Sequence, residues 1–166
     1  AARGLDEAHS RALISKSVEL ARKAREAYLA ENPQAGTRLV AGSVGPYGAY
    51  LADGSEYRGD YLRSAEVFTA FHRPRVEALL DAGADLLACE TLPSFAEIKA
   101  LADLLTAYPR ARAWFSFTLR DSEHLSDGTP LREVVSVLAA YPQVIALGIN
   151  CIALEKTTSA LQHLQS

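Results

Sequence analysis

Residues 85–119 read DLLACETLPSFAEIKALADLLTAYPRARAWFSFTL, which is a short apolar run, an amphipathic stretch and a second apolar run. The two apolar runs, 85–93 and 111–119, have the length of buried strands. Between them, apolar residues recur at helical spacing, at Ile98, Leu101, Ala102 and Leu105. Ser94 and Glu97 have the spacing of a capping box, which predicts that the helix begins there. The stretch therefore predicts a strand, a helix and a strand in succession.

The same alternation continues on both sides of this unit. Apolar periodicity predicts further helices at 5–30, 62–82, 129–140 and 154–165, and apolar runs predict strands at 38–46 and 143–151. Pro74 is expected to kink its helix or divide it into two segments. Thr129 followed by Pro130 is expected to start a helix as its N-cap and first turn. Helices that alternate with short buried strands are typical of an α/β protein with a parallel sheet.

An internal repeat narrows the architecture to two candidates. The tripeptide Ala-Tyr-Pro occurs at 107–109 and at 140–142, 33 residues apart, each time just before a predicted strand. A repeat of this size suits a (β/α)8 TIM barrel, and it also suits a doubly wound sheet. No G-x-G-x-x-G motif follows a predicted strand, so a dinucleotide-binding sheet is not indicated.

The number of predicted strands is too small for a closed barrel of this kind. If the barrel prediction is right, about half of the barrel lies outside the 166 residues. The sequence contains no methionine, and SALQHLQS at its end breaks off within a helical pattern. We therefore expect the chain to be an internal piece of a longer protein.

Composition excludes several function classes. The chain has 22% charged residues, a net charge of −3 and a pI near 5.8, so neither a nucleic-acid surface nor a polybasic membrane patch is indicated. No apolar run approaches the roughly 18 residues that a membrane-spanning helix needs. AARGLDEAHS at the start has no apolar signal core, and two cysteines are too few for a disulfide framework. A cytoplasmic protein is expected, and its oligomeric state stays open.

Polar side chains collect at the carboxyl ends of the predicted strands, where α/β enzymes place their chemistry. Glu90 directly follows DLLAC, and Cys151 ends the strand 143–151. Glu90 is either a solvated charge, a partner of a nearby arginine such as Arg120, or a binding group for a substrate ammonium. Cys89 precedes Glu90 by one residue and should face the opposite side of the strand, which favours a packing role.

Three roles remain open for Cys151 on the residues alone. It can be a small buried hydrophobe, a nucleophile activated by a base, or a ligand of zinc, which favours thiolates. No CxxC or HxxxH pair accompanies it, so partners for a metal must come from elsewhere. Of the four histidines only His124 lies in a loop at a strand end, and the acidic residues Asp121, Glu123 and Asp127 of that loop are expected to be solvated.

Several stretches together resemble the zinc-dependent homocysteine S-methyltransferases: AGSVGPYGAYLADGSEYRGDY (41–61), HRPRVEALLDAGADLLACETLP (72–93), FSFTLRDSEHLSDGTPL (115–131) and ALGINC (146–151). The resemblance covers essentially the whole chain and is strongest to the bacterial members that use S-methylmethionine. It implies a (β/α)8 barrel, of which residues 1–166 would be the central part, about strands 3–6, of one homocysteine-binding domain incomplete at both ends.

The resemblance also implies a site and a reaction. Zinc would be held by three cysteine thiolates, of which Cys151 follows the G-[IV]-N-C strand end, and Glu90 would bind the amino group of homocysteine. The reaction transfers a methyl group from a sulfonium donor, S-methylmethionine or S-adenosylmethionine, to the zinc-bound thiolate of L-homocysteine and gives methionine. The family's G-G-C-C motif, which supplies the other two ligands, is absent here. We therefore expect the 166 residues alone to bind zinc weakly or not at all and to be inactive.

Two other classes remain as alternatives. Another (β/α)-barrel enzyme, such as an aldolase or lyase, usually needs a strand-borne lysine or a carboxylate-rich metal site. The four lysines all lie in predicted helices, which argues against a Schiff base. A non-catalytic α/β binding module would hold no zinc and would leave Cys151 open to alkylation.

Overall fold

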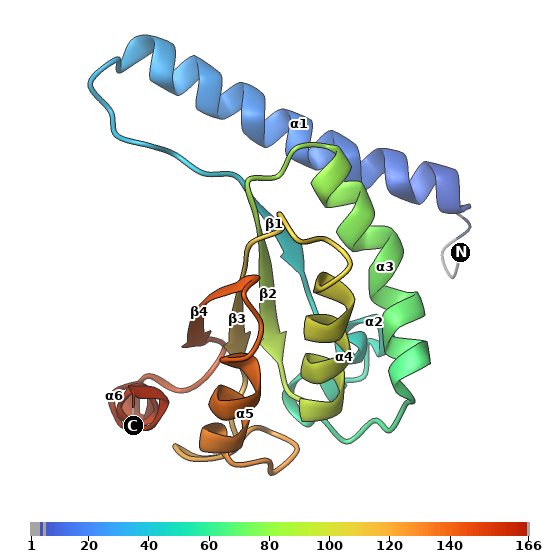
Figure 1. Ribbon diagram of the computed structural model, residues 1–166, viewed down its shortest axis with the longest axis vertical. Helices are drawn as coiled ribbons and strands as arrows, with labels where there is room; N and C mark the ends of the chain where they lie inside the picture. The colour runs from blue at the N-terminus through green and yellow to red at the C-terminus, as the bar shows by residue number, and fades with distance from the viewer. Residues whose placement is uncertain (1–3, 5, 166) are drawn as a thin grey trace.

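The computed structural model describes residue 4 and residues 6–165, which form a parallel four-stranded sheet with helices packed against it (Figure 1). The strands are β1 (Ala41–Val44), β2 (Leu86–Leu92), β3 (Ala113–Phe117) and β4 (Val144–Ile149). The helices are α1 (Glu7–Glu31), α2 (Tyr47–Leu51), α3 (Ala65–Asp81), α4 (Phe95–Leu105), α5 (Leu131–Leu138) and α6 (Leu154–Gln165), with a short 3-10 helix, η1 (Ser55–Tyr57). Every predicted strand and helix is present among the described residues, and α6 has the predicted bounds. Leu5, where the first helix is predicted to begin, lies outside the described residues.

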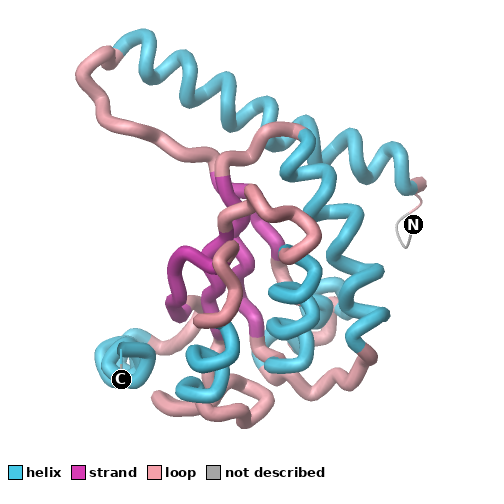
Figure 2. The backbone as a smooth tube through the Cα atoms, viewed as in Figure 1, coloured by secondary structure: helices cyan, strands magenta, loops and turns pink. Residues whose placement is uncertain are grey.

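The strand order decides between the two predicted architectures. The strands lie side by side in chain order, β1-β2-β3-β4, in the centre of the molecule (Figure 2). A doubly wound sheet reverses its order at a switch point, and none of the described strands does so. Right-handed crossovers that always step in one direction place their helices on one face of the sheet. The order is therefore that of a barrel wall.

The core lies between the sheet and the helices on this face. α3 contacts β1 and β2, and α4 lies beside α3 (Figure 1). A Cβ on Gly42 would lie 2.9 Å from the Leu79 side chain, so β1 approaches α3 closely where this residue has no side chain. Along β1, Ala41 and Ser43 face the other way and are exposed, because side chains alternate along a strand. Cys89 is fully buried in the core, as predicted.

The predicted capping box at the start of α4 is wrong. The Ser94 side chain makes no capping hydrogen bond, and Glu97 is fully buried instead of reaching back to the helix start. The free N–H of Phe95 donates to a carboxylate oxygen of Asp127, 2.6 Å away, from the loop after β3. A carboxylate suits the positive end of the helix dipole. The expectation that Asp127 is merely solvated is therefore also wrong.

Two smaller expectations about helix limits are corrected as well. α3 runs unbroken through Pro74, so the proline does not divide it. Packing of the helix on α1 and α4 compensates for the hydrogen bond that proline cannot donate. α5 begins at Leu131 with Pro130 as its N-cap, and the backbone N–H of Thr129 donates to Asp127 at 2.9 Å. Thr129 therefore belongs to the loop and does not cap the helix.

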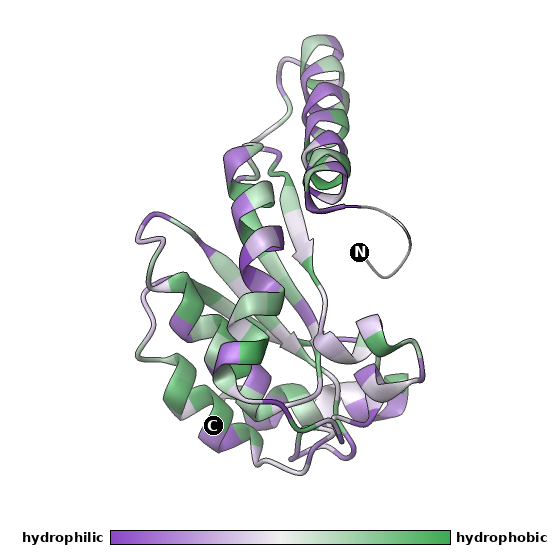
Figure 3. Cartoon of the chain, turned by 90° about the vertical axis from the view of Figure 1, so that its right-hand side faces the viewer, coloured by the Kyte–Doolittle hydropathy of each residue, from purple (hydrophilic) through white to green (hydrophobic). Residues whose placement is uncertain are grey.

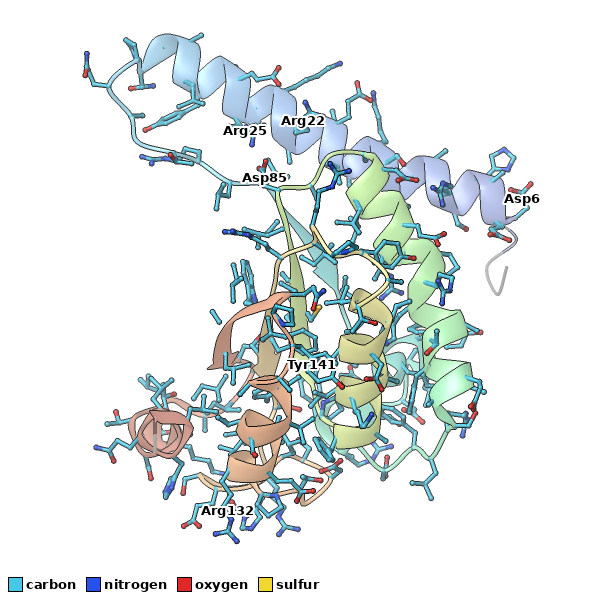
Figure 4. The ribbon with its side chains drawn as sticks, in the orientation of Figure 1. Asp6, Arg22, Arg25, Asp85, Arg132 and Tyr141 are labelled. Atoms are coloured by element: carbon cyan, nitrogen blue, oxygen red, sulfur yellow. The ribbon has the colours of Figure 1, made fainter. Side chains whose placement is uncertain are left out.

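α1 is the least buried element and is attached to the rest of the chain largely by arginines. Arg25 forms an ion pair of 2.6 Å with Asp85, and Arg22 donates to the carbonyl of Ala82 at 3.3 Å (Figure 4). Val18 is the one fully buried residue among the described residues of α1. Leu13 and Leu20 are more than half exposed, and hydrophobic residues occur among polar ones along the helix (Figure 3). Among the helices that the structure describes, none is long and apolar enough to span a membrane.

Candidate active site at the carboxyl edge of the sheet

Glu90 and Ser43 meet at the carboxyl ends of β2 and β1. The Ser43 hydroxyl donates to Oε1 of Glu90 over 2.6 Å. The alternative ion pair with Arg120 does not form, since the Arg120 guanidinium lies 3.3 Å from Asp121 instead. Within the described residues Glu90 has no cationic partner. A half-buried carboxylate whose one hydrogen-bonding partner in the described chain is a neutral hydroxyl can accept an ammonium group from a ligand.

Asn150 ties the end of β4 to the end of β2 across β3. Its Oδ1 accepts from the Thr91 backbone N–H over 3.0 Å, and its Nδ2 donates to Thr91 Oγ1 over 2.8 Å. Its own backbone N–H donates to the carbonyl of Phe117 in β3. One side chain therefore fixes the relative positions of two strand ends that are not neighbours in the sheet.

Two residues at these strand ends adopt a left-handed backbone conformation although neither is glycine. Thr91 has a φ of 62° and Cys151 a φ of 53°. For a β-branched residue such as Thr91 this conformation costs about 1–3 kcal/mol, and it persists only where the surroundings enforce it. The pairing of β2 with β3 shifts between Cys89 and Leu92, and the Asn150 bonds hold Thr91 there. Such strain is common at functional sites.

The backbone of Cys151 directs its thiol toward the same place. Its Sγ lies 3.7 Å from Thr91 Oγ1 and 3.4 Å from Asn150 Nδ2. Cys151 is exposed within the described chain, so no described residue buries its thiol. Cys89 is the opposite case, because burial, followed by the charge of Glu90, raises the pKa of its thiol and keeps it protonated.

The loop after β1, residues 45–61, packs on these strand ends. The Thr118 hydroxyl at the end of β3 donates to the carbonyl of Glu56 in η1 over 3.3 Å, and η1 also contacts β2. A Cβ on Gly59 would lie 2.6 Å from the Pro93 carbonyl, so the loop touches the chain beyond β2 as well. Tyr61 at the end of this loop is buried.

A buried polar cluster that the sequence did not predict lies beside this loop. Glu97 accepts from the Tyr47 backbone N–H at 2.6 Å, from His72 Nε2 at 2.7 Å and from the Tyr61 hydroxyl. Burial and the Glu97 charge raise the pKa of Tyr61, so it stays a donor. One signal was available, since Glu97 shares the helix face of the buried Leu101 four residues later.

The described residues supply one candidate metal ligand and not a complete site. Cys151 offers an exposed thiol, which as thiolate suits zinc, and Asn150 and Thr91 are placed as its hydrogen-bonding partners. Among residues 4 and 6–165 there is no group of three or more His, Cys, Asp or Glu side chains that could hold a metal ion. Any further ligands would have to come from other parts of the protein.

A parallel sheet in chain order, with a carboxylate and a thiol on its carboxyl edge, defines part of a (β/α)-barrel enzyme. Comparison with known proteins specifies the family. The homocysteine S-methyltransferase family model matches residues 1–166. The chain belongs to this family, which is not a family of aldolases or lyases.

The relatives agree in sequence and in structure. The chain is 88% identical over 164 residues to a homocysteine S-methyltransferase of Escherichia coli, and this match covers 99% of the chain. It is 49% identical over 168 residues to the Bacillus subtilis homocysteine S-methyltransferase YbgG. The crystal structure of the metallated form of the E. coli homocysteine methyltransferase MmuM superposes with a TM-score of 0.97 and covers 98% of this chain. The chain spans about half of these relatives, 53% of each of the two sequences and 57% of the crystal chain.

Proposed function

We propose that these residues form part of a homocysteine S-methyltransferase that moves a methyl group from a sulfonium donor, S-methylmethionine or S-adenosylmethionine, to the thiol of L-homocysteine and gives methionine. One observation carries the proposal: Cys151 Sγ lies 3.7 Å from the hydroxyl of Thr91, the residue that follows Glu90. A ligand that is both an amine and a thiol, as homocysteine is, can reach both groups from this edge.

Glu90 is the proposed binding group for the homocysteine ammonium. Its carboxylate has no competing cation within the described chain, and the Ser43 hydroxyl holds one of its oxygens at 2.6 Å. A charge-assisted hydrogen bond to the ammonium would fix the amino-acid end of the substrate. The thiol end then points along the edge of the sheet toward β4.

Cys151 is the proposed zinc ligand at that end, with two further cysteines of a G-G-C-C motif outside these residues as its partners. When bound, zinc acts as a Lewis acid that keeps the substrate sulfur deprotonated near neutral pH. Asn150 and Thr91 orient the Cys151 sulfur through their contacts of 3.4 and 3.7 Å. The metallated form of the E. coli relative supports a metal in this family.

The loop after β1 would favour the transfer by excluding water. A thiolate and a sulfonium lose their charges as the methyl group moves, so a water-poor pocket helps the reaction. The η1 segment of that loop is bonded to Thr118 at the end of β3 and also contacts β2, the strand that carries Glu90.

We further propose that residues 1–166 form strands 3–6 of a single barrel domain and that the enzyme is cytoplasmic. The edge strands β1 and β4 pair on one side only within the described chain, as an incomplete barrel requires. The 166 residues alone, with one zinc-binding thiol, are expected to be inactive.

The test is an assay of the full-length enzyme with homocysteine and each sulfonium in turn, with methionine as the measured product. Turnover with one or both donors supports the proposal. Absence of methionine with both donors, in protein that contains stoichiometric zinc, would refute it.

Replacing Glu90 by Gln in the full-length enzyme is expected to raise the KM for homocysteine about tenfold, because a neutral amide binds an ammonium more weakly than a carboxylate does. The effect on kcat should be smaller, since the ammonium is bound equally in the ground and transition states. Steady-state kinetics measure both values. Glu133→Gln on the exposed side of α5 is the control, and an unchanged KM in Glu90→Gln would contradict the assigned role.

Alkylation gives a test of the metal ligand that does not depend on turnover. In zinc-loaded full-length enzyme, iodoacetamide should modify Cys151 slowly, and removal of zinc by a chelator should speed this reaction about tenfold or more, since a metal-bound thiolate is shielded. Cys89 is fully buried and should stay unmodified in both states, which makes it an internal control. Peptide mass spectrometry measures the two sites, and equal rates at Cys151 would contradict the proposal.

A further inference from the structure

One buried carboxylate holds both ends of the loop after β1, residues 45–61. Oε1 of Glu97 accepts from the backbone N–H of Tyr47 over 2.6 Å, at the start of the loop. Oε2 accepts from the hydroxyl of Tyr61, at its end. Fourteen positions separate these two residues in the chain, but they share one side chain of α4. Glu97 is fully buried, so water does not compete for these bonds.

The carboxylate is itself fixed in place from α3. His72, also fully buried, contacts Glu97 Oε1 over 2.7 Å, and no second partner is found for its other ring nitrogen within the described chain. Arg75, one turn further along α3, donates to the carbonyl of Gly45 over 3.0 Å. α3 and α4 therefore hold the base of the loop together, through a histidine, an arginine and a carboxylate.

The segment that Glu97 closes lies on the proposed substrate edge. In the middle of the loop, the carbonyl of Glu56 accepts a hydrogen bond from Thr118 at the end of β3. Gly59 contacts the chain after β2. The first residue of the loop, Gly45, comes two positions after Ser43, whose hydroxyl donates to Glu90. A shift of the loop base would therefore displace both the η1 segment that contacts β2 and β3 and the strand end whose Ser43 hydroxyl orients the Glu90 carboxylate.

From this arrangement we propose that Glu97 is a positioning residue for substrate binding: it fixes loop 45–61, and through the loop it sets the affinity of the site for the amino-acid end of homocysteine. It does not touch the substrate. The substrate part of this inference rests on the proposed function, whereas the closure of the loop by Glu97 does not.

Native-state proteolysis tests the loop closure directly. Arg58 is the one Lys or Arg between Tyr47 and Tyr61, and it is exposed, so trypsin has one cleavage site inside the loop. In full-length enzyme Glu97→Gln, which keeps the size of the side chain, is expected to raise the rate of cleavage after Arg58 about tenfold, because local opening governs this rate. Tyr61→Phe removes one of the bonds and should raise it by a smaller factor. It gives the same test if Glu97→Gln does not fold.

Kinetics of the same variants test the effect on the substrate. Glu97→Gln should raise the KM for homocysteine about fivefold to tenfold and change kcat by less than about threefold. Val134→Ala is the control, because it weakens the core under α5, away from the loop. It should lower the melting temperature without changing the KM or the cleavage rate at Arg58.

The two parts of the inference fail in different ways. A wild-type rate of cleavage after Arg58 in both Glu97→Gln and Tyr61→Phe would contradict the closure of the loop by Glu97. This outcome does not depend on the reaction that the enzyme catalyses. Faster cleavage with an unchanged KM for homocysteine, or an equal change of both readouts in Val134→Ala, would overturn the positioning role. If the wild-type protein makes no methionine, the proposed function fails, and the substrate part of this inference fails with it. The proteolysis experiment still tests whether Glu97 closes the loop.

Discussion

Cys151→Ser in the full-length enzyme is expected to lower zinc affinity by more than about 100-fold and to reduce methionine formation to background. Loss of an outer partner of a metal ligand alone costs about 10–100-fold, and here the ligand itself is lost. A serine hydroxyl stays protonated near neutral pH and is a poorer ligand for zinc than a thiolate. Atomic emission of the purified variant measures the metal, and the homocysteine assay measures turnover.

Cys89→Ala is the matched control for this experiment. Cys89 is fully buried and lies on the helix side of β2. Its replacement should cost some stability through a small cavity but should leave the zinc content at the wild-type value. A Cys151→Ser variant that kept both its metal and its turnover would exclude Cys151 from the site.

Gly48→Val is expected to lower the free energy of unfolding by about 3 kcal/mol, which is at the upper end for overpacking. A Cβ at this position would lie 2.5 Å from the backbone nitrogen of Glu56 and 2.7 Å from the Tyr61 ring. Two of the three nearest atoms belong to the backbone of the same loop, which cannot yield without moving away from the sheet. Denaturant unfolding of full-length protein, followed by circular dichroism, measures the loss.

Gly45→Ala serves as the control three residues earlier. A Cβ there would meet no atom within 4 Å, so the change in stability should stay within about 0.5 kcal/mol. Equal stability losses in Gly45→Ala and Gly48→Val would show that the space around Gly48 is not the cause.

The elements of this fold could be predicted from the sequence because each of them buries one face. Short apolar runs and stripes at helical spacing mark these faces directly, and α6 was bounded correctly on that basis. The pattern of apolar residues did not distinguish a barrel from a doubly wound sheet. It depends on the strand order, which local periodicity does not encode.

The candidate site was predictable where strand ends carry unusual residues, and less so where contacts cross the fold. Glu90 and Cys151 follow apolar runs, and the family resemblance gave them roles. The capping prediction for Glu97 failed because its side chain satisfies His72 and Tyr61, 25 and 36 residues away in the chain. A capping box is a local rule, and a buried partner outweighs it.

The hydrogen bonds between Asn150 and Thr91 restrict how the strands of this sheet can move. Two hydrogen bonds across an intervening strand resist any sliding of β2 against β4 at that end. Thermal motion of the strands should therefore be largest at their amino ends. Amide hydrogen exchange should be faster there than at the carboxyl ends. The separation between Glu90, the proposed anchor of the amino group, and Cys151, the proposed metal ligand, should thereby stay constant while the remainder of the sheet fluctuates.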